Sequence, residues 1–99
     1  MAHFIISITY KKSLQEVDKF INEHVKFLNK YYDLNNFILS GRKNPRTGGI
    51  ILCKFDAKEN VQEAIKEDPF YKNELADYEI IEFVPTKKLD AISELDIFQ

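Results

Sequence analysis

The chain has 99 residues, of which 44% are hydrophobic and 30% are charged, a composition typical of one folded domain and not of a disordered chain. Its formal net charge of −2 provides no basic surface, so we expect no nucleic-acid partner. The sequence has no apolar stretch of membrane-spanning length, no recognisable signal peptide and a single cysteine. We therefore expect no membrane partner, no internal disulfide and a cytoplasmic location.

Residues 4–10 alternate with a period of two, because the even positions are all apolar and the odd positions are mixed. This pattern predicts a strand with one strongly apolar face. The mixed face is expected to line a pocket or to meet a second sheet.

A long helix is predicted after this strand. Ser13 and Glu16 have the spacing of a capping box, which predicts a helix start, and an apolar stripe continues to about Asp33. The stripe consists of Val17, Ile21, His24, Leu28 and Tyr31. His24 is therefore placed on the apolar side of the helix and not on its solvent face.

A hairpin is predicted in the middle of the chain. Residues 37–40 form a short strand closed by Gly41, and residues 50–55 form a third strand that is apolar on nearly both faces, so both faces should be covered. The intervening residues 42–48 are rich in basic side chains and short enough for a hairpin loop. The two strands should therefore pair antiparallel.

A second helix is predicted over residues 57–65, with capping residues at 56–59, and Pro69 stops it. Proline disfavours helical dihedral angles in the residue before it, so Asp68 should occupy a fixed, non-helical corner. A connector then leads to a fourth strand over residues 78–84.

The order strand, helix, strand, strand, helix, strand predicts an α+β fold of the ferredoxin-like βαββαβ type. Its sheet is antiparallel, both helices cover one face, and the opposite face is open. This domain is expected over residues 1–85. Residues 86–99 are expected to form a C-terminal helix or a loosely ordered tail, with apolar residues at helical spacing: Leu89, Ile92, Leu95 and Phe98.

His24 and Asp68 are the candidate acid/base pair. An imidazole exchanges protons near neutral pH, and a neighbouring carboxylate fixes its tautomer. The proposed fold places the two helices side by side, so the Asp68 corner is expected to approach the middle of the first helix. The alternative is structural: His24 is a hydrogen-bonded histidine in a helix stripe, and Asp68 is only a helix stop.

Other candidate groups are less specific. Arg42 and Arg46 in the basic loop are candidates for holding an anion, although such loops are often only solvated. Ser40 at a strand end is a candidate for contacting a substrate. The two histidines, His3 and His24, lack the spacing of metal ligands, so we expect no metal and no cofactor.

Several short motifs together resemble the YCII-related family of small proteins. They are His24-x-x-x-Leu28, Ser40-Gly41, Gly48-Gly49-Ile50, Asp68-Pro69-Phe70, and Tyr78-Glu79-Ile80 through Phe83. The resemblance extends from about Phe4 to Val84. Glu74 departs from the family pattern because a glycine usually follows the Asp-Pro-Phe motif at this point, and Arg42 stands where a proline commonly follows Ser-Gly.

The resemblance implies a homodimeric α+β barrel in which two sheets pack face to face. This arrangement would cover the open sheet face predicted above. It also implies a histidine/aspartate site, to which His24 and Asp68 correspond, and proton-transfer reactions such as dehydrochlorination of a ring compound.

We therefore expect a small dimeric enzyme that moves a proton on a small organic molecule, by elimination or isomerisation. His24 would act as acid and base, Asp68 would orient it, and Ser40, Arg42 and Arg46 would position the substrate. The alternative is a non-catalytic module that binds a small ligand or a protein, in which the His24 and Asp68 pair only ties two helices together. Oxidative ring chemistry without a cofactor is a third reading. A catalytic pair must border a cavity, whereas a structural pair can be sealed.

Overall fold

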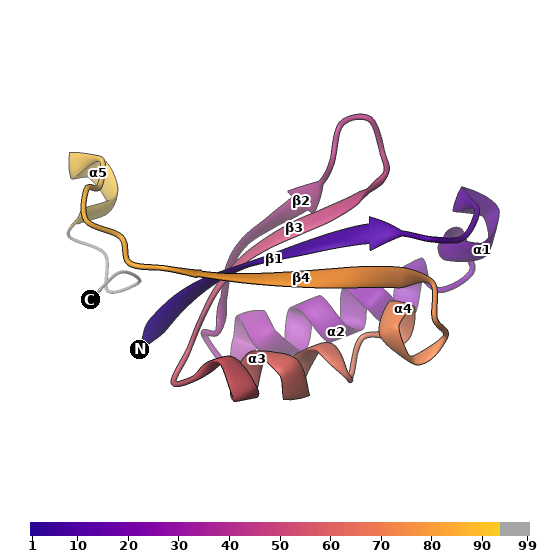
Figure 1. Cartoon of the computed structure of the whole chain (residues 1–99), viewed down its shortest axis with the longest axis horizontal. Helices are drawn as coiled ribbons and strands as arrows, with labels where there is room; N and C mark the ends of the chain where they lie inside the picture. The colour runs from indigo at the N-terminus through magenta and orange to yellow at the C-terminus, as the bar shows by residue number, and fades with distance from the viewer. Residues whose placement is uncertain (94–99) are drawn as a thin grey trace.

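The computed structural model describes residues 1–93 and consists of one antiparallel sheet and several helices (Figure 1). The strands are β1 (Ala2–Tyr10), β2 (Phe37–Arg42), β3 (Gly48–Phe55) and β4 (Ala76–Phe83), in the spatial order β2-β3-β1-β4. The helices are α1 (Leu14–Asp18), α2 (Ile21–Asp33), α3 (Lys58–Ile65), α4 (Pro69–Lys72) and α5 (Asp90–Ser93). Helices α2, α3 and α4 lie on one face of the sheet (Figure 1). The predicted βαββαβ order and the antiparallel hairpin are confirmed.

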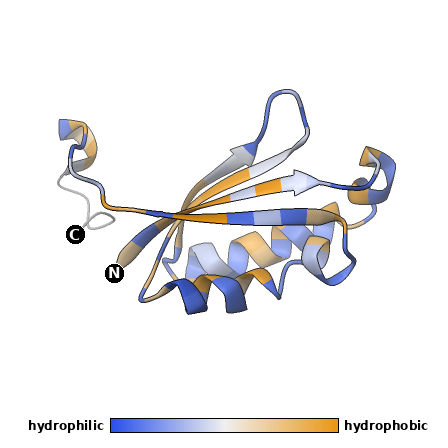
Figure 2. Cartoon of the chain, viewed as in Figure 1, coloured by the Kyte–Doolittle hydropathy of each residue, from blue (hydrophilic) through white to orange (hydrophobic). Residues whose placement is uncertain are grey.

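The core lies between the sheet and helices α2, α3 and α4. Phe4 of β1 lies opposite Cys53 of β3, and Ile6 lies opposite Ile51; none of the four is more than 2% exposed. Hydropathy along the chain follows this arrangement, with hydrophobic positions on the sheet-facing sides of the helices (Figure 2). The period-two pattern of the first strand therefore predicts its buried face correctly.

The prediction of one helix from Ser13 to Asp33 is wrong, because the helix is interrupted between α1 and α2. The Ser13 hydroxyl accepts a hydrogen bond from the Glu16 amide, so the predicted cap is present, but the Glu16 carboxylate accepts from Lys19 instead of closing the box. The Phe20 N–H then donates to the carbonyl of Val17, three residues back. This tight turn ends α1, and α2 begins after it as a separate helix.

The second helical region also differs from the prediction. Ala57 is the N-cap of α3, and its amide donates to the side-chain oxygen of Asn60, so Asp56 does not provide the cap. The predicted connector contains the short helix α4, and β4 begins at Ala76 instead of Tyr78.

The outer face of the sheet is only partly covered within one chain. Ile50 of β3 is 39% exposed, so the prediction that both faces of this strand are covered is wrong for the single chain. Ile81 of β4 and Leu39 of β2 are exposed on the same side. Helices α2, α3 and α4 lie on the other face of the sheet (Figure 1), and these apolar side chains are exposed in the single chain.

No helix in the described part of the chain has the length and apolar character needed to cross a membrane. Within residues 1–93, part of the predicted C-terminal helix is present as α5, and Leu89 before it is exposed. The predicted positions Leu95 and Phe98 lie outside the described residues.

A polar tie holds α2 against the end of α3. The Glu67 carboxylate accepts hydrogen bonds from the Lys30 ammonium and from the Tyr31 hydroxyl, both on α2. These two donors lower the pKa of Glu67, and burial together with Glu67 raises the pKa of Tyr31. The tie lies directly before Asp68 and so fixes the corner relative to α2.

Replacement Glu67→Gln should lower the free energy of unfolding at pH 7 by about 0.5 kcal/mol, because a half-exposed ion pair is partly screened by water. The pKa of Glu67 is lower in the folded chain than in the unfolded one, so its contribution is present above the unfolded pKa and is lost as the pH falls through the folded pKa. Urea unfolding from pH 3 to 7 measures this difference. If the free energies of unfolding of the wild type and the variant differed by the same amount at every pH, the lowered pKa of Glu67 would be contradicted.

Replacement Glu74→Gly should stabilise the chain. Glu74 has a φ of 55°, in the left-handed region that side chains with a Cβ adopt only at a cost. Removal of this strain should exceed the extra entropy that glycine has when unfolded, for a net gain of about 0.5 to 1 kcal/mol in urea unfolding. Glu74→Gln is the matched control, since it removes the charge, keeps the strain and should leave stability unchanged. Equal stabilities of the two variants would show that the backbone is unstrained.

Candidate active site

Asp68 occupies the non-helical corner that the sequence predicts. Its dihedral angles are φ −71° and ψ 127°, Pro69 takes the first position of α4, and the Asp68 carboxylate caps this helix. Oxygen Oδ1 accepts from the Phe70 amide at 3.0 Å. The side chain is completely buried, so the corner carries a charge into the core.

Three hydrogen-bond donors converge on this carboxylate. His24 Nδ1 lies 2.9 Å from Oδ1, although the two residues are 44 positions apart in the sequence. The hydroxyl of Tyr78 donates to the other oxygen, Oδ2, at 2.6 Å. A buried carboxylate is tolerated only when such donors replace its lost hydration. The predicted proximity of His24 and Asp68 is therefore confirmed.

Tyr78 is a part of this network that sequence reasoning missed. It lies opposite Ile8 on the core-facing side of β4, and burial together with the Asp68 charge raises the pKa of its phenol well above the usual value. The phenol therefore stays protonated and serves as a permanent donor to Asp68. The available signals were its place in the motif Tyr78-Glu79-Ile80 and a tyrosine at a core-facing position of a strand, and neither by itself indicates a polar network.

The ring of His24 is held in one plane and one tautomer. It stacks on Phe70, with ring centroids 4.2 Å apart and planes at 9°. An ionised carboxylate can only accept hydrogen bonds, so Nδ1 is the donor in the contact with Asp68. In the neutral form of the ring, Nε2 then carries the lone pair. The His24 side chain is 13% exposed, so this ring is partly open to a cavity.

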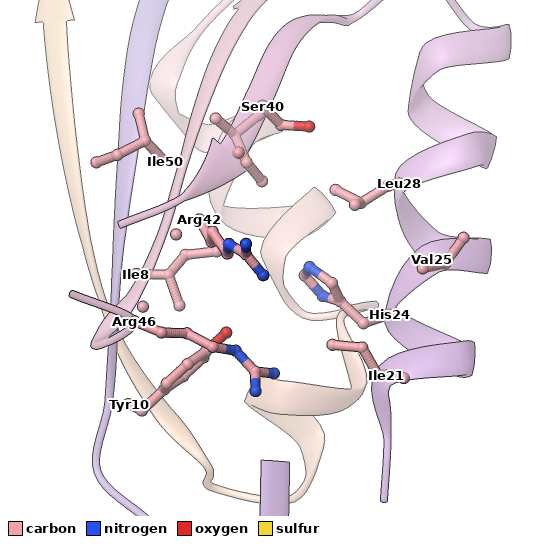
Figure 3. Close-up of a pocket in the computed structure, with 14 residues that line it drawn as sticks. Ile8, Tyr10, Ile21, His24, Val25, Leu28, Ser40, Arg42, Arg46 and Ile50 are labelled. Carbon is pink, nitrogen blue, oxygen red and sulfur yellow. The ribbon is translucent and has the colours of Figure 1, made fainter. Parts of the chain in front are cut away.

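A cavity of about 420 Å³ lies between α2, the end of β1 and the β2–β3 hairpin (Figure 3). His24 lines it, together with these residues: Ile8, Tyr10, Ile21, Val25, Leu28, Ser40, Gly41, Arg42, Arg46, Gly48, Gly49, Ile50 and Ile51. Gly48 is required where β3 crosses close to β1, because an added Cβ would lie 1.7 Å from the carbonyl oxygen of Ile8. The His24 pair thus borders a cavity and is not sealed.

All three predicted substrate-contacting residues line this cavity. The guanidinium groups of Arg42 and Arg46 extend from the hairpin toward His24 (Figure 3). Ser40 shares a 2.7 Å hydrogen bond with the hydroxyl of Tyr32. Arg46 also donates to the carboxylate of Asp18 at 2.6 Å, a contact between the hairpin loop and α1 that sequence reasoning missed. The unforeseen break between α1 and α2 explains the omission.

The remaining reactive side chains lie apart from this cavity. Cys53 is buried in the sheet, and burial raises the pKa of its thiol to about 12, so the thiol is protonated at neutral pH. His3 is buried in β1 and packs edge-on against Phe83. Among residues 1–93, no group of three or more His, Cys, Asp or Glu side chains is arranged to hold a metal ion.

Comparison with solved structures gives a strong match of fold. The structure is similar to 5-chloro-2-hydroxyhydroquinone dehydrochlorinase (TftG) from Burkholderia phenoliruptrix AC1100 in complex with 2,5-dihydroxybenzoquinone, with a TM-score of 0.73. The match covers 82% of this chain and 92% of the dehydrochlorinase, at 17% sequence identity. At this identity the similarity establishes the fold, an α+β arrangement consistent with the ferredoxin-like dimeric α+β barrel.

Sequence comparison identifies the family. No curated protein matches the chain in sequence. The YCII-related domain matches residues 1–84, which include all four strands and the His24 and Asp68 network. The chain belongs to the YCII-related family.

Proposed function

We propose that this protein is an enzyme that transfers a proton on a small organic molecule, with His24 as the acid and base. The observation that supports this function is the position of the His24 ring. Its Nδ1 is bound to a buried carboxylate, and its other side borders a cavity large enough for a small molecule. This is the arrangement in which an imidazole can exchange a proton with a bound substrate.

The lone pair on His24 Nε2 accepts a proton from a carbon or oxygen atom of the substrate. In an elimination, the electrons of the broken C–H bond form a new double bond, and the leaving group departs with its own bonding pair. In an isomerisation, His24 returns the proton to another atom of the same substrate. Asp68 stabilises the positive charge that the ring carries between these steps.

Tyr78 and Phe70 act as positioning residues in this proposal. The Tyr78 hydroxyl holds the second oxygen of Asp68, so the carboxylate cannot rotate away from His24. Phe70 holds the ring plane by stacking, and its amide binds the same oxygen of Asp68 as His24 does.

Ser40, Arg42 and Arg46 position the substrate opposite His24. They come from β2 and the hairpin loop, whereas His24 comes from α2, so a bound molecule would lie between the two elements. The loop is anchored to the sheet because the Tyr10 amide donates to the carbonyl of Thr47 at 2.9 Å. A fixed loop supports the fixed substrate geometry that proton transfer requires.

The similar dehydrochlorinase supports elimination as the reaction type. That protein is named for removing chloride from a hydroxylated ring, and its structure contains a quinone. A ring of this size also fits the dimensions of the cavity in the present chain. A non-catalytic role for the pair is less well supported, because a purely structural contact has no need to border a cavity.

We also propose that the protein acts as a homodimer in the cytoplasm. The uncovered outer face of the sheet carries apolar side chains in all four strands, namely Ile5, Leu39, Ile50, Leu52 and Ile81. A second copy of the same sheet would bury them by face-to-face packing. The single, free cysteine suits a reducing compartment.

Replacement of the network residues should reduce turnover in a graded order. On a substrate identified by screening small ring and chain compounds, His24→Gln should lower kcat by about 10²- to 10⁴-fold, the usual contribution of a general acid or base. Asp68→Asn should have a smaller effect, and Tyr78→Phe the smallest, because these residues act through His24. Steady-state kinetics on folded variants measures the order.

Glu23→Gln, next to His24 on the exposed side of α2, is the matched control and should retain full activity. Wild-type turnover in His24→Gln would contradict the proposal.

A test without substrate is also available, since ¹⁵N spectra of the neutral ring should place the proton on Nδ1. A proton on Nε2 would remove the base that the mechanism uses.

Replacement Ile81→Lys should convert the dimer into a monomer. Ile81 is 44% exposed in the single chain, so the lysine is tolerated by the fold, but it would place a charge inside a face-to-face interface. Light scattering after size-exclusion chromatography measures the mass. Leu34→Lys, at the exposed end of α2, is the control and should remain dimeric. A monomeric wild type, or a dimer unaffected by Ile81→Lys, would contradict this interface.

A further inference from the structure

Cationic side chains line the cavity although the chain as a whole is acidic. Two guanidinium groups, those of Arg42 and Arg46, line it, and among the described residues no carboxylate does. The formal net charge of the chain is −2. Guanidinium groups that line a cavity favour a negatively charged occupant, because they form charge-assisted hydrogen bonds with an anion and gain little from a neutral ligand.

The two arginines differ in their present partners. Arg46 is paired with Asp18 at 2.6 Å, and this contact lowers the pKa of the Asp18 carboxyl. Asp18 lies on α1, outside the cavity lining, and is 54% exposed. Arg42 forms no ion pair with any side chain of residues 1–93. Arg42 can therefore bind an anionic ligand without breaking an existing ion pair, whereas Arg46 must first release the carboxylate of Asp18.

The rest of the cavity suits a hydrocarbon skeleton. Side chains of α2 provide an apolar wall on the side of His24, namely Ile21, Val25 and Leu28, and Ile8 of β1 lies across from them beside the arginines (Figure 3). The α2 wall and the two arginines thus lie on opposite sides of a space of about 420 Å³. A molecule with one charged end and a compact apolar body matches this separation.

We propose that the substrate is a small organic anion, with its charged oxygen atoms bound by Arg42 and its carbon skeleton against the apolar wall. Arg46 joins the site by releasing Asp18, so that Asp18 acts as an internal competitor of the substrate. This inference rests on the proposed function and specifies the chemical class on which His24 acts.

Binding of the anion next to the reacting carbon also serves the chemistry. When Nε2 takes the proton, the electron pair of the broken C–H bond stays on the substrate and delocalises onto the oxygen atoms next to the reacting carbon. Negative charge therefore increases at the position that the guanidinium groups face. Preorganised cations at such a position lower the barrier to proton removal. The electron pair then returns to form the new double bond as the leaving group departs, or to accept the proton at another atom.

Benzoate and its uncharged analogue benzamide provide a test that needs no turnover. We expect benzoate to bind in the millimolar range or tighter by isothermal titration calorimetry, and benzamide at least tenfold more weakly. Arg42→Gln should weaken benzoate binding by about tenfold, the effect of a lost charge-assisted contact. Lys43→Gln removes the same charge from the same loop but outside the cavity, and should change binding by less than twofold.

Asp18→Asn tests the exchange at Arg46. Release of Arg46 should strengthen benzoate binding by about threefold to tenfold, a modest gain because the lost ion pair is partly exposed. Glu16→Gln on the same helix is the matched control and should have no effect. Weaker binding in Asp18→Asn would show that Asp18 supports the site and would overturn its role as a competitor.

Equal affinities for benzoate and benzamide, or equal effects of Arg42→Gln and Lys43→Gln, would overturn the proposed substrate class. Benzoate binding by the His24→Gln variant distinguishes failure of the anion site from failure of the proposed proton transfer. The anion site predicts that this variant still binds benzoate, whether or not His24 transfers a proton. Loss of benzoate binding in folded His24→Gln would show that the arginines do not form the anion site.

Discussion

The buried charge of Asp68 is the constraint on which the rest of the structure depends. Its carboxylate is removed from water at the junction between two helices, and each hydrogen bond that compensates it comes from a different element. His24 comes from α2, Phe70 from α4 and Tyr78 from β4. Loss of one donor would leave a buried charge incompletely solvated, so the carboxylate fixes helices and sheet in a single arrangement.

The fold order could be predicted from strong local signals, namely period-two strands, apolar helix stripes and the proline after Asp68. The contact between His24 and Asp68 needed more than local signals, because it was inferred from the predicted fold and from the resemblance to the YCII-related family. Tyr78 and Asp18 were not predicted, because their contacts depend on tertiary geometry and their local patterns are ordinary. A tyrosine on a strand and an aspartate on a helix gain a role only through the partner that folding brings to them.

The break between α1 and α2 illustrates the same limit. The apolar spacing continues through Phe20, so periodicity alone predicts one helix. The Phe20 to Val17 hydrogen bond nevertheless ends α1, and the offset allows Asp18 to reach Arg46 in the hairpin loop. Val17 is fully buried, so core packing holds α1 in place beside the cavity. The departure from the predicted helix thus produces a contact at the candidate site.

The two sides of the His24 ring face groups of opposite charge. Asp68 is in hydrogen-bond contact with Nδ1, and Arg42 and Arg46 line the cavity that the ring borders. An anion held by the arginines would have its carbon skeleton between them and the ring. The arginines that select the substrate would therefore also hold its reacting carbon in a fixed position relative to Nε2.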